Sequence, residues 1–417
     1  MLDSFLDRFA HFGVHLGLDR IQTLLANLGN PHQRVPIVHV AGTNGKGSVC
    51  AYLSSILTAA GYRTGRYTSP HLVSWCERVC IDGTPIPEPE FAELLKRVAA
   101  AIDPDRPTPT QFEVVTAAAW LYFAEQSVDI AVIEVGLGGR LDATNVCDRP
   151  LVSVITSISR DHWQRLGSTL AEIAFEKAGI LKRDCPVVLG PLPPEAEDIF
   201  LERIEALDCP AVWVEPATAL SETEAIDNGF RYPLPLPGDV QLLNSALTLA
   251  TVRQLRQQGW QISDDAIVRG TNNTRWRGRL EWLTWRDRKI LIDGAHNVAS
   301  ADVLRRYVDR QQTLVTWVMG MLSSKDVEGI LTTLLRPGDR VRFLPVPGHS
   351  FATPSDLAIL AVDICPELAG CATDDVDVRA ALTAACKDEG RLPVLCGSLY
   401  LIGDFFRTQA ISEIRNA

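Results

Sequence analysis

The sequence of 417 residues lacks the features that would place it in a membrane, on a secretory route or on nucleic acid. No apolar run reaches the length of a transmembrane helix, and residues 1–17 have neither the basic start nor the long apolar stretch of a signal peptide. A formal net charge of −11 provides no basic excess for binding nucleic acid or an anionic membrane. The ten cysteines form no C-x-x-C pair and no zinc-binding spacing, which indicates free thiols and a cytoplasmic protein.

The composition, with 46% hydrophobic and 22% charged residues, is typical of a globular protein long enough for two domains. Buried-strand patterns alternate with segments long enough for helices, which predicts an α/β fold with a mostly parallel sheet. The expected strands lie at residues 36–41, 128–135 and 151–155 and, in a second block, at 289–292, 314–319, 341–345 and 393–396. A polar, basic segment separates the blocks. We therefore predict domains at 1–272 and 279–417, joined by a linker at 273–278.

A glycine-rich turn follows the strand at 36–41 and has the layout of a phosphate-binding loop. Glycines let the backbone turn sharply and bring its N–H groups close to an anion, and the positive end of a helix expected at 48–60 would point at the same anion. The candidate residues are Gly42, Thr43, Asn44, Gly45, Lys46, Gly47 and Ser48. Val40 stands where the usual pattern has its first glycine, so an ordinary glycine-rich turn with an exposed lysine stays open as the alternative.

Two further strands end in chemically useful side chains. Glu134 closes the strand at 128–135 and leads into a second glycine-rich loop that carries Arg140 and Asp142. A carboxylate at this edge suits magnesium, although a strand-end Glu can equally cap the next turn. His162 follows the strand at 151–155, where a lone histidine is either structural or a ligand.

Lys177 falls on the apolar face of a predicted helix. Thr169 and Glu172 have the spacing of a capping box, and the helix that they open is expected to run to Ala178. A lysine on such a face either extends its ammonium group to solvent or is an amine in a dry setting that pairs with an anion or is chemically modified.

A series of motifs resembles the folylpolyglutamate synthase and dihydrofolate synthase family, a branch of the Mur-ligase-like ATP-dependent amide ligases. The matching motifs are HVAGTNGKGS at 39–48, TSPHL at 68–72, EVGLGGRLDATN at 134–145, DH at 161–162, EKAGI at 176–180, WRGR at 276–279, DGAHN at 293–297 and GSLY at 397–400. The phosphate loop of this family also lacks the leading glycine. The resemblance implies a P-loop-type N-terminal domain with helices on both faces of its sheet, which binds ATP and folate or pteroate, and a smaller Rossmann-like glutamate-ligase domain.

The resemblance also implies roles for individual residues. Lys46 and the loop amides would hold the ATP phosphates, Ser69, Glu134 and His162 would bind one or two magnesium ions, and Lys177 would be carbamylated. Arg140 and Asp142 would contact folate or pteroate, Asn244, Arg279 and Asp293 the nucleotide, and His296 and Ser398 the incoming glutamate. The candidate catalytic residues are Lys46, Lys177, Arg279 and His296. The sequence departs from the family pattern at two places. One is the segment 238–244, and the other is Arg277, which stands where the family usually has a proline.

The expected function is that of an ATP-dependent ligase that adds L-glutamate to dihydropteroate, to reduced folates or to both, by way of an acyl phosphate. The alternatives are a folylpolyglutamate synthase only, a Mur-type ligase acting on a cell-wall precursor, or a nucleotide-dependent binding protein without ligase activity. The expected partners are these small molecules, with no nucleic acid and no membrane, and the expected state is a monomer.

Overall fold

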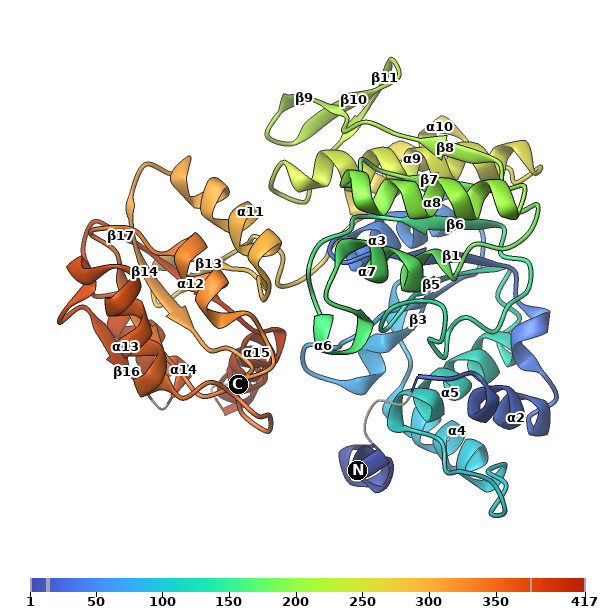
Figure 1. Ribbon diagram of the computed structural model, residues 1–417, viewed down its shortest axis with the longest axis horizontal. Helices are drawn as coiled ribbons and strands as arrows, with labels where there is room; N and C mark the ends of the chain where they lie inside the picture. Colours follow the sequence, from blue (N-terminus) through green and yellow to red (C-terminus); the bar gives the residue numbers. More distant parts are fainter. Residues whose placement is uncertain (1, 13–15, 376, 416–417) are drawn as a thin grey trace. The chain divides into compact units, whose positions relative to one another are not determined.

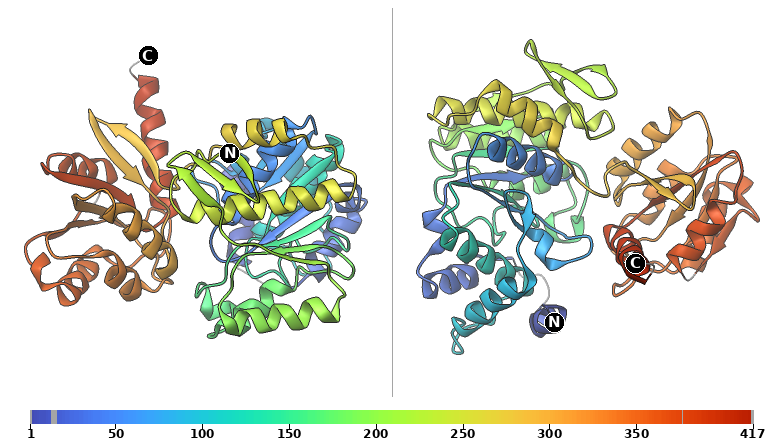
Figure 2. Two further views of the ribbon diagram at one scale, coloured as in Figure 1. Left: turned by 90° about the horizontal axis from the view of Figure 1, so that it is seen from above. Right: turned by 180° about the vertical axis from the view of Figure 1, so that it is seen from behind.

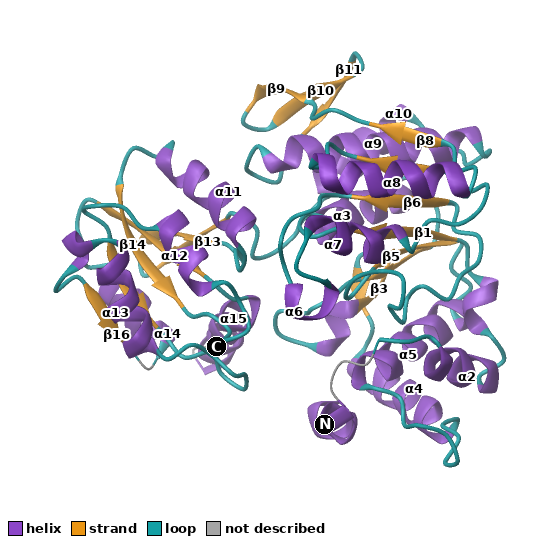
Figure 3. Ribbon diagram, in the orientation of Figure 1, coloured by secondary structure: helices purple, strands orange, loops and turns teal. Residues whose placement is uncertain are grey.

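The computed structural model describes residues 2–12, 16–375 and 377–415, so that residues 1 and 13–15 of the N-terminal stretch 1–17 lie outside the described part. Contacts between residues divide the chain into two compact units. The first comprises residues 1–159, 163–235 and 240–275, and the second comprises 160–162, 236–239 and 276–417. The main change of unit therefore falls inside the segment 273–278. In each unit, helices pack around strands, as the mixed α/β prediction requires (Figure 3).

An eight-stranded, mostly parallel sheet forms the centre of the first unit (Figure 1). Its order is β4-β3-β2-β5-β1-β6-β7-β8, and only the β2–β3 and β3–β4 pairs are antiparallel. The strands are β1 (Ile37–Ala41), β2 (Thr64–Tyr67), β3 (Val79–Ile81), β4 (Thr84–Pro85), β5 (Ile130–Glu134), β6 (Val152–Ile155), β7 (Val187–Leu189) and β8 (Ala211–Trp213). The central strands β1, β5 and β6 are buried throughout, which explains why most of their residues are apolar.

Helices cover both faces of this sheet. They are α1 (Leu2–Leu6), α2 (Asp19–Asn27), α3 (Lys46–Ala59), α4 (Glu88–Ala100), α5 (Gln111–Glu125), α6 (Trp163–Leu166), α7 (Leu170–Ala178), α8 (Pro194–Ala206), α9 (Val240–Gln257) and α10 (Asp264–Asn273), with short 3-10 helices at Asp7–Phe12, Pro31–Arg34 and Trp75–Arg78. The chain moves from β1 to β2 in one direction along the sheet and from β6 to β8 in the other. Right-handed crossovers therefore place α3 and the α7–α8 pair on opposite faces.

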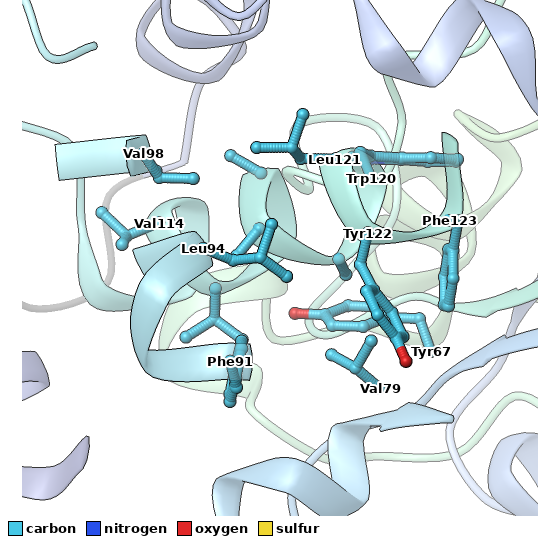
Figure 4. Close-up of a cluster of buried hydrophobic side chains, with 14 of the residues drawn as sticks. Tyr67, Val79, Phe91, Leu94, Val98, Val114, Trp120, Leu121, Tyr122 and Phe123 are labelled. Atoms are coloured by element: carbon cyan, nitrogen blue, oxygen red, sulfur yellow. The ribbon is translucent and has the colours of Figure 1, made fainter. Parts of the chain in front are cut away.

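Two hydrophobic layers fix the helices on these faces. On one face, α4 and α5 pack against β2, β3 and β5 through a large apolar cluster that includes Phe91, Trp120 and Phe123 (Figure 4). On the other face, α3 contacts β1, β2 and β5, while α9 and α10 lie along α3 (Figure 2). A small antiparallel sheet, of β9 (Thr218–Ser221), β10 (Glu224–Asp227) and β11 (Phe230–Pro233), projects from this unit beside α9 (Figure 1).

The second unit is a smaller α/β unit with a six-stranded sheet of order β12-β13-β17-β14-β15-β16. Only the β12–β13 pair is antiparallel. The elements are β12 (Glu281–Trp285), β13 (Arg288–Ile292), α11 (Val298–Asp309), β14 (Leu314–Met319), α12 (Val327–Leu334), β15 (Arg340–Phe343), α13 (Pro354–Ile364), a 3-10 helix (Pro366–Leu368), β16 (Ala372–Asp374), α14 (Val378–Ala385), β17 (Arg391–Cys396) and α15 (Leu399–Arg415). Among the described residues of the whole chain, the structure contains no helix that is both long and apolar enough to span a membrane.

Close packing of α10 on α3 gives the first prediction. A Cβ atom built on Gly270 would lie 2.4 Å from the Cα atom of Ile56 and 2.7 Å from its backbone nitrogen, and backbone atoms cannot rotate away. We expect Gly270→Ala to lower the free energy of unfolding by about 2 kcal/mol through overpacking, although alanine favours helix. The exposed Asn272→Ala on the same helix is the control. Urea unfolding with equal midpoints for the two variants would contradict the prediction.

Candidate functional site

The candidate site begins at the carboxyl ends of β1 and β6, which are neighbours in the sheet. From β1 the chain crosses toward β2, and from β6 it crosses toward β7, so the direction of the crossovers reverses between these two strands. Ligands of open α/β sheets bind at such reversals, beyond the carboxyl ends of the strands. The glycine-rich loop after β1 lies at this point, as the sequence predicts.

The segment after β6 forms hydrogen bonds that hold the glycine-rich loop in place. The amide of Thr43 donates to the carbonyl of Ser157 (2.8 Å), and the Thr156 hydroxyl donates to the carbonyl of Asn44 (2.6 Å). Gly42 has a φ of 147°, and a Cβ atom there would come within 1.9 Å of the Thr156 hydroxyl oxygen. Only glycine fits this position. Sequence reasoning missed Thr156 and Ser157 as partners of the loop, although both directly follow a predicted strand.

The loop leads into α3, whose N-terminal end is open to an anion. The helix begins at Lys46, two residues earlier than the sequence suggests, because Gly45 adopts a left-handed conformation (φ 89°) as its N-cap. No side chain caps this end, and the first N–H groups of a helix have no partner inside the helix. Asn244 of α9 lies against the same turn, since a Cβ atom on Gly45 would be 2.4 Å from its Oδ1 atom. Helix α3 can therefore offer its amides to a phosphate.

Two lysines converge on one carbonyl oxygen of the loop. Lys46 Nζ donates to the carbonyls of Gly42 and Thr43, both at 3.1 Å, and Lys177 Nζ donates to the same Gly42 carbonyl at 2.8 Å. Lys177 is only 5% exposed, in the last turn of α7. The Thr169–Glu172 capping box that opens this helix is present, so the local prediction is confirmed. The second lysine therefore reaches the phosphate loop and does not extend to solvent.

Ser69 and Glu134 lie together at the carboxyl ends of β2 and β5. The amide of Ser69 donates to Glu134 Oε2 (3.2 Å), and Glu134 is 5% exposed. A hydroxyl and a carboxylate are hard oxygen donors, which fits magnesium, an ion that takes few ligands from the protein and keeps several waters. Within the described ranges, no group of three or more His, Cys, Asp and Glu side chains is arranged to hold a metal ion.

Arg140 and Asp142 belong to the same loop, at 134–145, but they have different environments. The Asp142 carboxylate is 4% exposed and accepts hydrogen bonds from the amides of Leu137 (2.8 Å) and Thr144 (3.0 Å). Burial raises the pKa of Asp142, although these hydrogen bonds oppose the rise. Arg140 is exposed and forms an ion pair with Glu176 (2.7 Å). Asp142 thus organises the loop from inside, and Arg140 lies at its surface.

In the second unit, Arg279 and Asp293 are neighbours at the end of β13. Asp293 accepts hydrogen bonds from the amides of Leu280 (2.8 Å) and Ala295 (2.9 Å), and Arg279 Nη1 donates to the carbonyl of Gly278 (3.1 Å). Burial raises the pKa of Asp293, and the Arg279 charge opposes this rise. Ser398 is buried after β17, the strand next to β13, and accepts a hydrogen bond from the amide of Tyr400 (3.2 Å).

A cluster around Asp161 contains His296 and a lysine that sequence reasoning missed. His296 Nδ1 donates to the carbonyl of Gly294 (2.7 Å), and its Nε2 lies 3.4 Å from Asp161 Oδ2. Lys325 Nζ lies 2.6 Å from Asp161 Oδ1 and 3.5 Å from His162 Nε2. Burial alone would raise the pKa of Asp161, but the hydrogen bond from His296 and the charges of His296, Lys325 and His162 hold it well below its usual range. The sequence feature that could have identified Lys325 is its position shortly after the predicted strand at 314–319.

The first unit thus brings together the phosphate loop, Lys177, Asn244, Ser69 and Glu134. The second brings together Arg279 with Asp293, and His296 with His162 and Asp161. All ten cysteines are free thiols, which agrees with the sequence-based expectation. The roles of the individual site residues stay predictions.

Comparisons with known proteins agree along nearly the whole chain. Residues 40–186 match the Mur ligase middle domain, and residues 279–408 match the C-terminal domain of dihydrofolate synthetase. The chain is 36% identical over 410 residues to a probable dihydrofolate synthetase of Schizosaccharomyces pombe, covering 94% of this chain and 98% of that protein. It is 34% identical over 416 residues to the dihydrofolate synthase/folylpolyglutamate synthase of Bacillus subtilis, covering 94% and 95%.

Solved structures show the same architecture. Folylpolyglutamate synthase of Mycobacterium tuberculosis, complexed with ADP and AMPPCP, has a TM-score of 0.88 at 32% identity and covers 98% of this chain and 97% of its own. Escherichia coli FolC in complex with DHPP and ADP has a TM-score of 0.84 at 30% identity, covering 99% and 97%. A bifunctional folylpolyglutamate synthase/dihydrofolate synthase with Mn, AMPPNP and L-glutamate bound has a TM-score of 0.84 at 31% identity, covering 98% of each chain.

The fit of Gly42 against Thr156 gives a prediction about anion binding. Gly42→Ala should displace the loop and weaken the binding of inorganic tripolyphosphate about tenfold or more, because loop amides must point at the anion. Gly61→Ala is the matched control: this glycine also has a positive φ (93°), but no atom lies within 4 Å of its Cβ position. Titration calorimetry measures both affinities. Equal weakening in the two variants would show that backbone strain in general, and not the shape of the loop, is responsible.

Proposed function

Because the chain belongs to the folylpolyglutamate synthase and dihydrofolate synthase family, we propose that it is an ATP-dependent ligase that joins L-glutamate to dihydropteroate, to reduced folates or to both. The observation that carries this proposal is the convergence of Lys46 and Lys177 on the Gly42 carbonyl at the open end of α3. Two cations that share one acceptor repel each other, so the arrangement favours an anion beside them.

The reaction needs such a site because a carboxylate is a poor electrophile. In the first step a carboxylate oxygen of the acceptor attacks the γ-phosphorus of ATP, which forms an acyl phosphate and releases ADP. In the second step the amine of L-glutamate attacks the acyl carbon, loses a proton and displaces inorganic phosphate. Catalysis of phosphoryl transfer consists largely of positioning and of stabilising negative charge on the transferred group.

The residues in the first unit suit the first step. The amides at the start of α3 and Lys46 would hold the phosphates, with Asn244 near the same turn. Arg279 and Asp293 of the second unit are proposed nucleotide contacts, and Arg279 would also stabilise the charge of the transferring phosphoryl group. The 134–145 loop, which carries Arg140 and Asp142, would bind the acceptor acid. His296 and Ser398 are proposed to bind the incoming glutamate.

Ser69, Glu134 and His162 are the proposed ligands of one or two magnesium ions. Bound magnesium would neutralise charge on the phosphate oxygens. The backbone amide of Ser69 donates to the Glu134 carboxylate, so the two residues are neighbours, and a hydroxyl and a carboxylate are oxygen donors that suit this ion. The relative with Mn, AMPPNP and L-glutamate bound supports a divalent metal beside the nucleotide.

Lys177 is proposed to be carbamylated. The Lys177 ammonium group would first lose a proton, and the neutral amine would then add carbon dioxide, forming an N–C bond, breaking one C–O π bond and releasing a second proton. An anion would thereby replace a cation next to Lys46. The remaining N–H could still donate to the Gly42 carbonyl. The burial of Lys177 and its position beside Lys46 on the same carbonyl support the proposal.

We also propose that the protein works as a monomer in the cytoplasm. Its ten free cysteines suit a reducing compartment. The negative net charge and the globular composition fit an enzyme whose partners are small molecules.

The direct test supplies dihydropteroate and tetrahydrofolate separately with ATP, magnesium and L-glutamate, and identifies the products by mass. We expect phosphate release only when acceptor and glutamate are both present, with the mass of one glutamate added to at least one acceptor. Lys46→Ala should lower turnover by at least about a hundredfold, because it removes charge stabilisation at the phosphates. Lys96→Ala, at an exposed lysine with only a surface ion pair, is the control. Slow ATP hydrolysis that ignores glutamate would instead indicate a nucleotide-dependent binding protein.

A separate experiment tests the carbamate. Lys177→Ala should lower activity about tenfold or more, and small carboxylates such as acetate should restore part of it, because they supply the missing anion. Lys177→Arg keeps a positive charge but cannot be carbamylated, so it should be inactive as well. Carbon-13 bicarbonate should give the wild-type protein a carbamate resonance that both variants lack. Full activity of Lys177→Arg after removal of bicarbonate would eliminate the carbamate.

A further inference from the structure

Three buried polar side chains form a continuous hydrogen-bonded chain inside the first unit. His39 Nε2 lies 2.9 Å from the Thr144 hydroxyl oxygen, which lies 2.6 Å from Asp142 Oδ1. The three residues are 1%, 0% and 4% exposed, respectively. His39 belongs to β1, whereas Thr144 and Asp142 belong to the 134–145 loop.

The hydrogen bonds in this chain have a defined direction. Both oxygens of the Asp142 carboxylate accept from backbone amides, Oδ1 from Thr144 and Oδ2 from Leu137. An ionised carboxylate only accepts, so the single hydrogen of the Thr144 hydroxyl is donated to Asp142. The Thr144 oxygen must then accept from His39 Nε2. Burial lowers the pKa of His39 to about 3, with a smaller effect from Lys182, so the imidazole is neutral and carries its one hydrogen on Nε2.

A role in stability alone does not explain these residues. The other residues of β1 are apolar and fully buried, and an apolar side chain at position 39 would avoid the desolvation of an imidazole. Buried polar networks hold one particular geometry when every member is satisfied. The geometry held in this case is that of the loop proposed to bind the acceptor acid, tied to the strand that enters the phosphate loop three residues after His39.

We propose that His39 and Thr144 are positioning residues that fix Asp142 and the 134–145 loop relative to the phosphate loop, so that the acceptor carboxylate meets the γ-phosphate of ATP. This inference rests on the proposed function. Its physical basis is the sensitivity of phosphoryl transfer to small displacements, since a shift of about 1 Å can cost on the order of a hundredfold in rate. His39 and Thr144 act through Asp142 and need no contact with the substrate.

The test compares Thr144→Val, which keeps the shape but removes the hydroxyl, with Thr144→Ser, which keeps the hydroxyl. Thr144→Val should raise the KM for the acceptor acid about tenfold, because a buried hydrogen bond to a charged group is lost, while the KM values for ATP and glutamate change less than about twofold. Thr144→Ser should recover most of the acceptor KM. A lower melting temperature with kcat and all three KM values at the wild-type level would assign the chain to stability alone and overturn the proposal. Equal rises in all three would overturn it as well.

A second measurement is independent of turnover. Nitrogen-15 NMR of histidine-labelled wild-type protein should show His39 as the neutral Nε2–H tautomer that does not titrate between about pH 5 and pH 8. A neutral Nδ1–H tautomer would reverse the direction of the chain and overturn the proposal. Absence of any ligase product from the wild-type enzyme would instead refute the proposed function. An active wild-type enzyme with unaltered Thr144→Val kinetics would refute only the positioning role.

Discussion

The site is organised by one backbone carbonyl, that of Gly42, which accepts hydrogen bonds from the Nζ atoms of Lys46 and Lys177. One lysine comes from the loop itself and the other from α7, more than a hundred residues later in the chain. The contact requires that β1 and β6 be neighbours, that a glycine occupy position 42 and that α7 return over the carboxyl end of the sheet. Each of these conditions is met by the fold, and together they bring both lysine side chains to the loop that leads into the N-terminal end of α3.

The same arrangement explains why the apolar strands and the polar loops are distributed as they are. Strands β1, β5 and β6 are buried throughout, and each ends at a segment of the candidate site: the glycine-rich loop, Glu134, and the Thr156–Ser157 pair that holds this loop. Positions on such strand ends are set by the hydrogen-bonded sheet to a precision that long loops cannot give. The second unit repeats this plan at the ends of β13 and β17, with Asp293 and Ser398.

Sequence patterns predicted the parts of this structure that depend on local chemistry. The apolar runs located β1, β5 and β6, the capping box located α7, and the placement of a lysine on the apolar face of α7 marked Lys177 as unusual. The family resemblance is confirmed by the comparisons. Local patterns could not show the antiparallel edge formed by β3 and β4 or the projecting β9–β11 sheet, because these short strands depend on their partners for pairing.

Contacts between segments that are distant in the sequence could not be predicted from local patterns either. The ion pair of Lys325 with Asp161 joins positions 164 residues apart, and the pairing of Lys177 with Gly42 joins positions 135 apart. A sequence shows that such residues lie near strand ends, but not which of them meet. Residues 160–162 and 236–239 group with the second unit because of contacts that form in the folded chain. A prediction that divides the sequence into two continuous domains cannot include such short segments.

Lys46 and the amides at the start of α3 are proposed to promote the phosphorylation of a carboxylate. The most direct measurement is to incubate the wild-type protein with ATP, magnesium and the acceptor acid, with hydroxylamine in place of glutamate. Hydroxylamine captures acyl phosphates, so we expect an acceptor hydroxamate to form in step with ADP. A preparation that binds both nucleotide and acceptor but yields ADP without hydroxamate would contradict it.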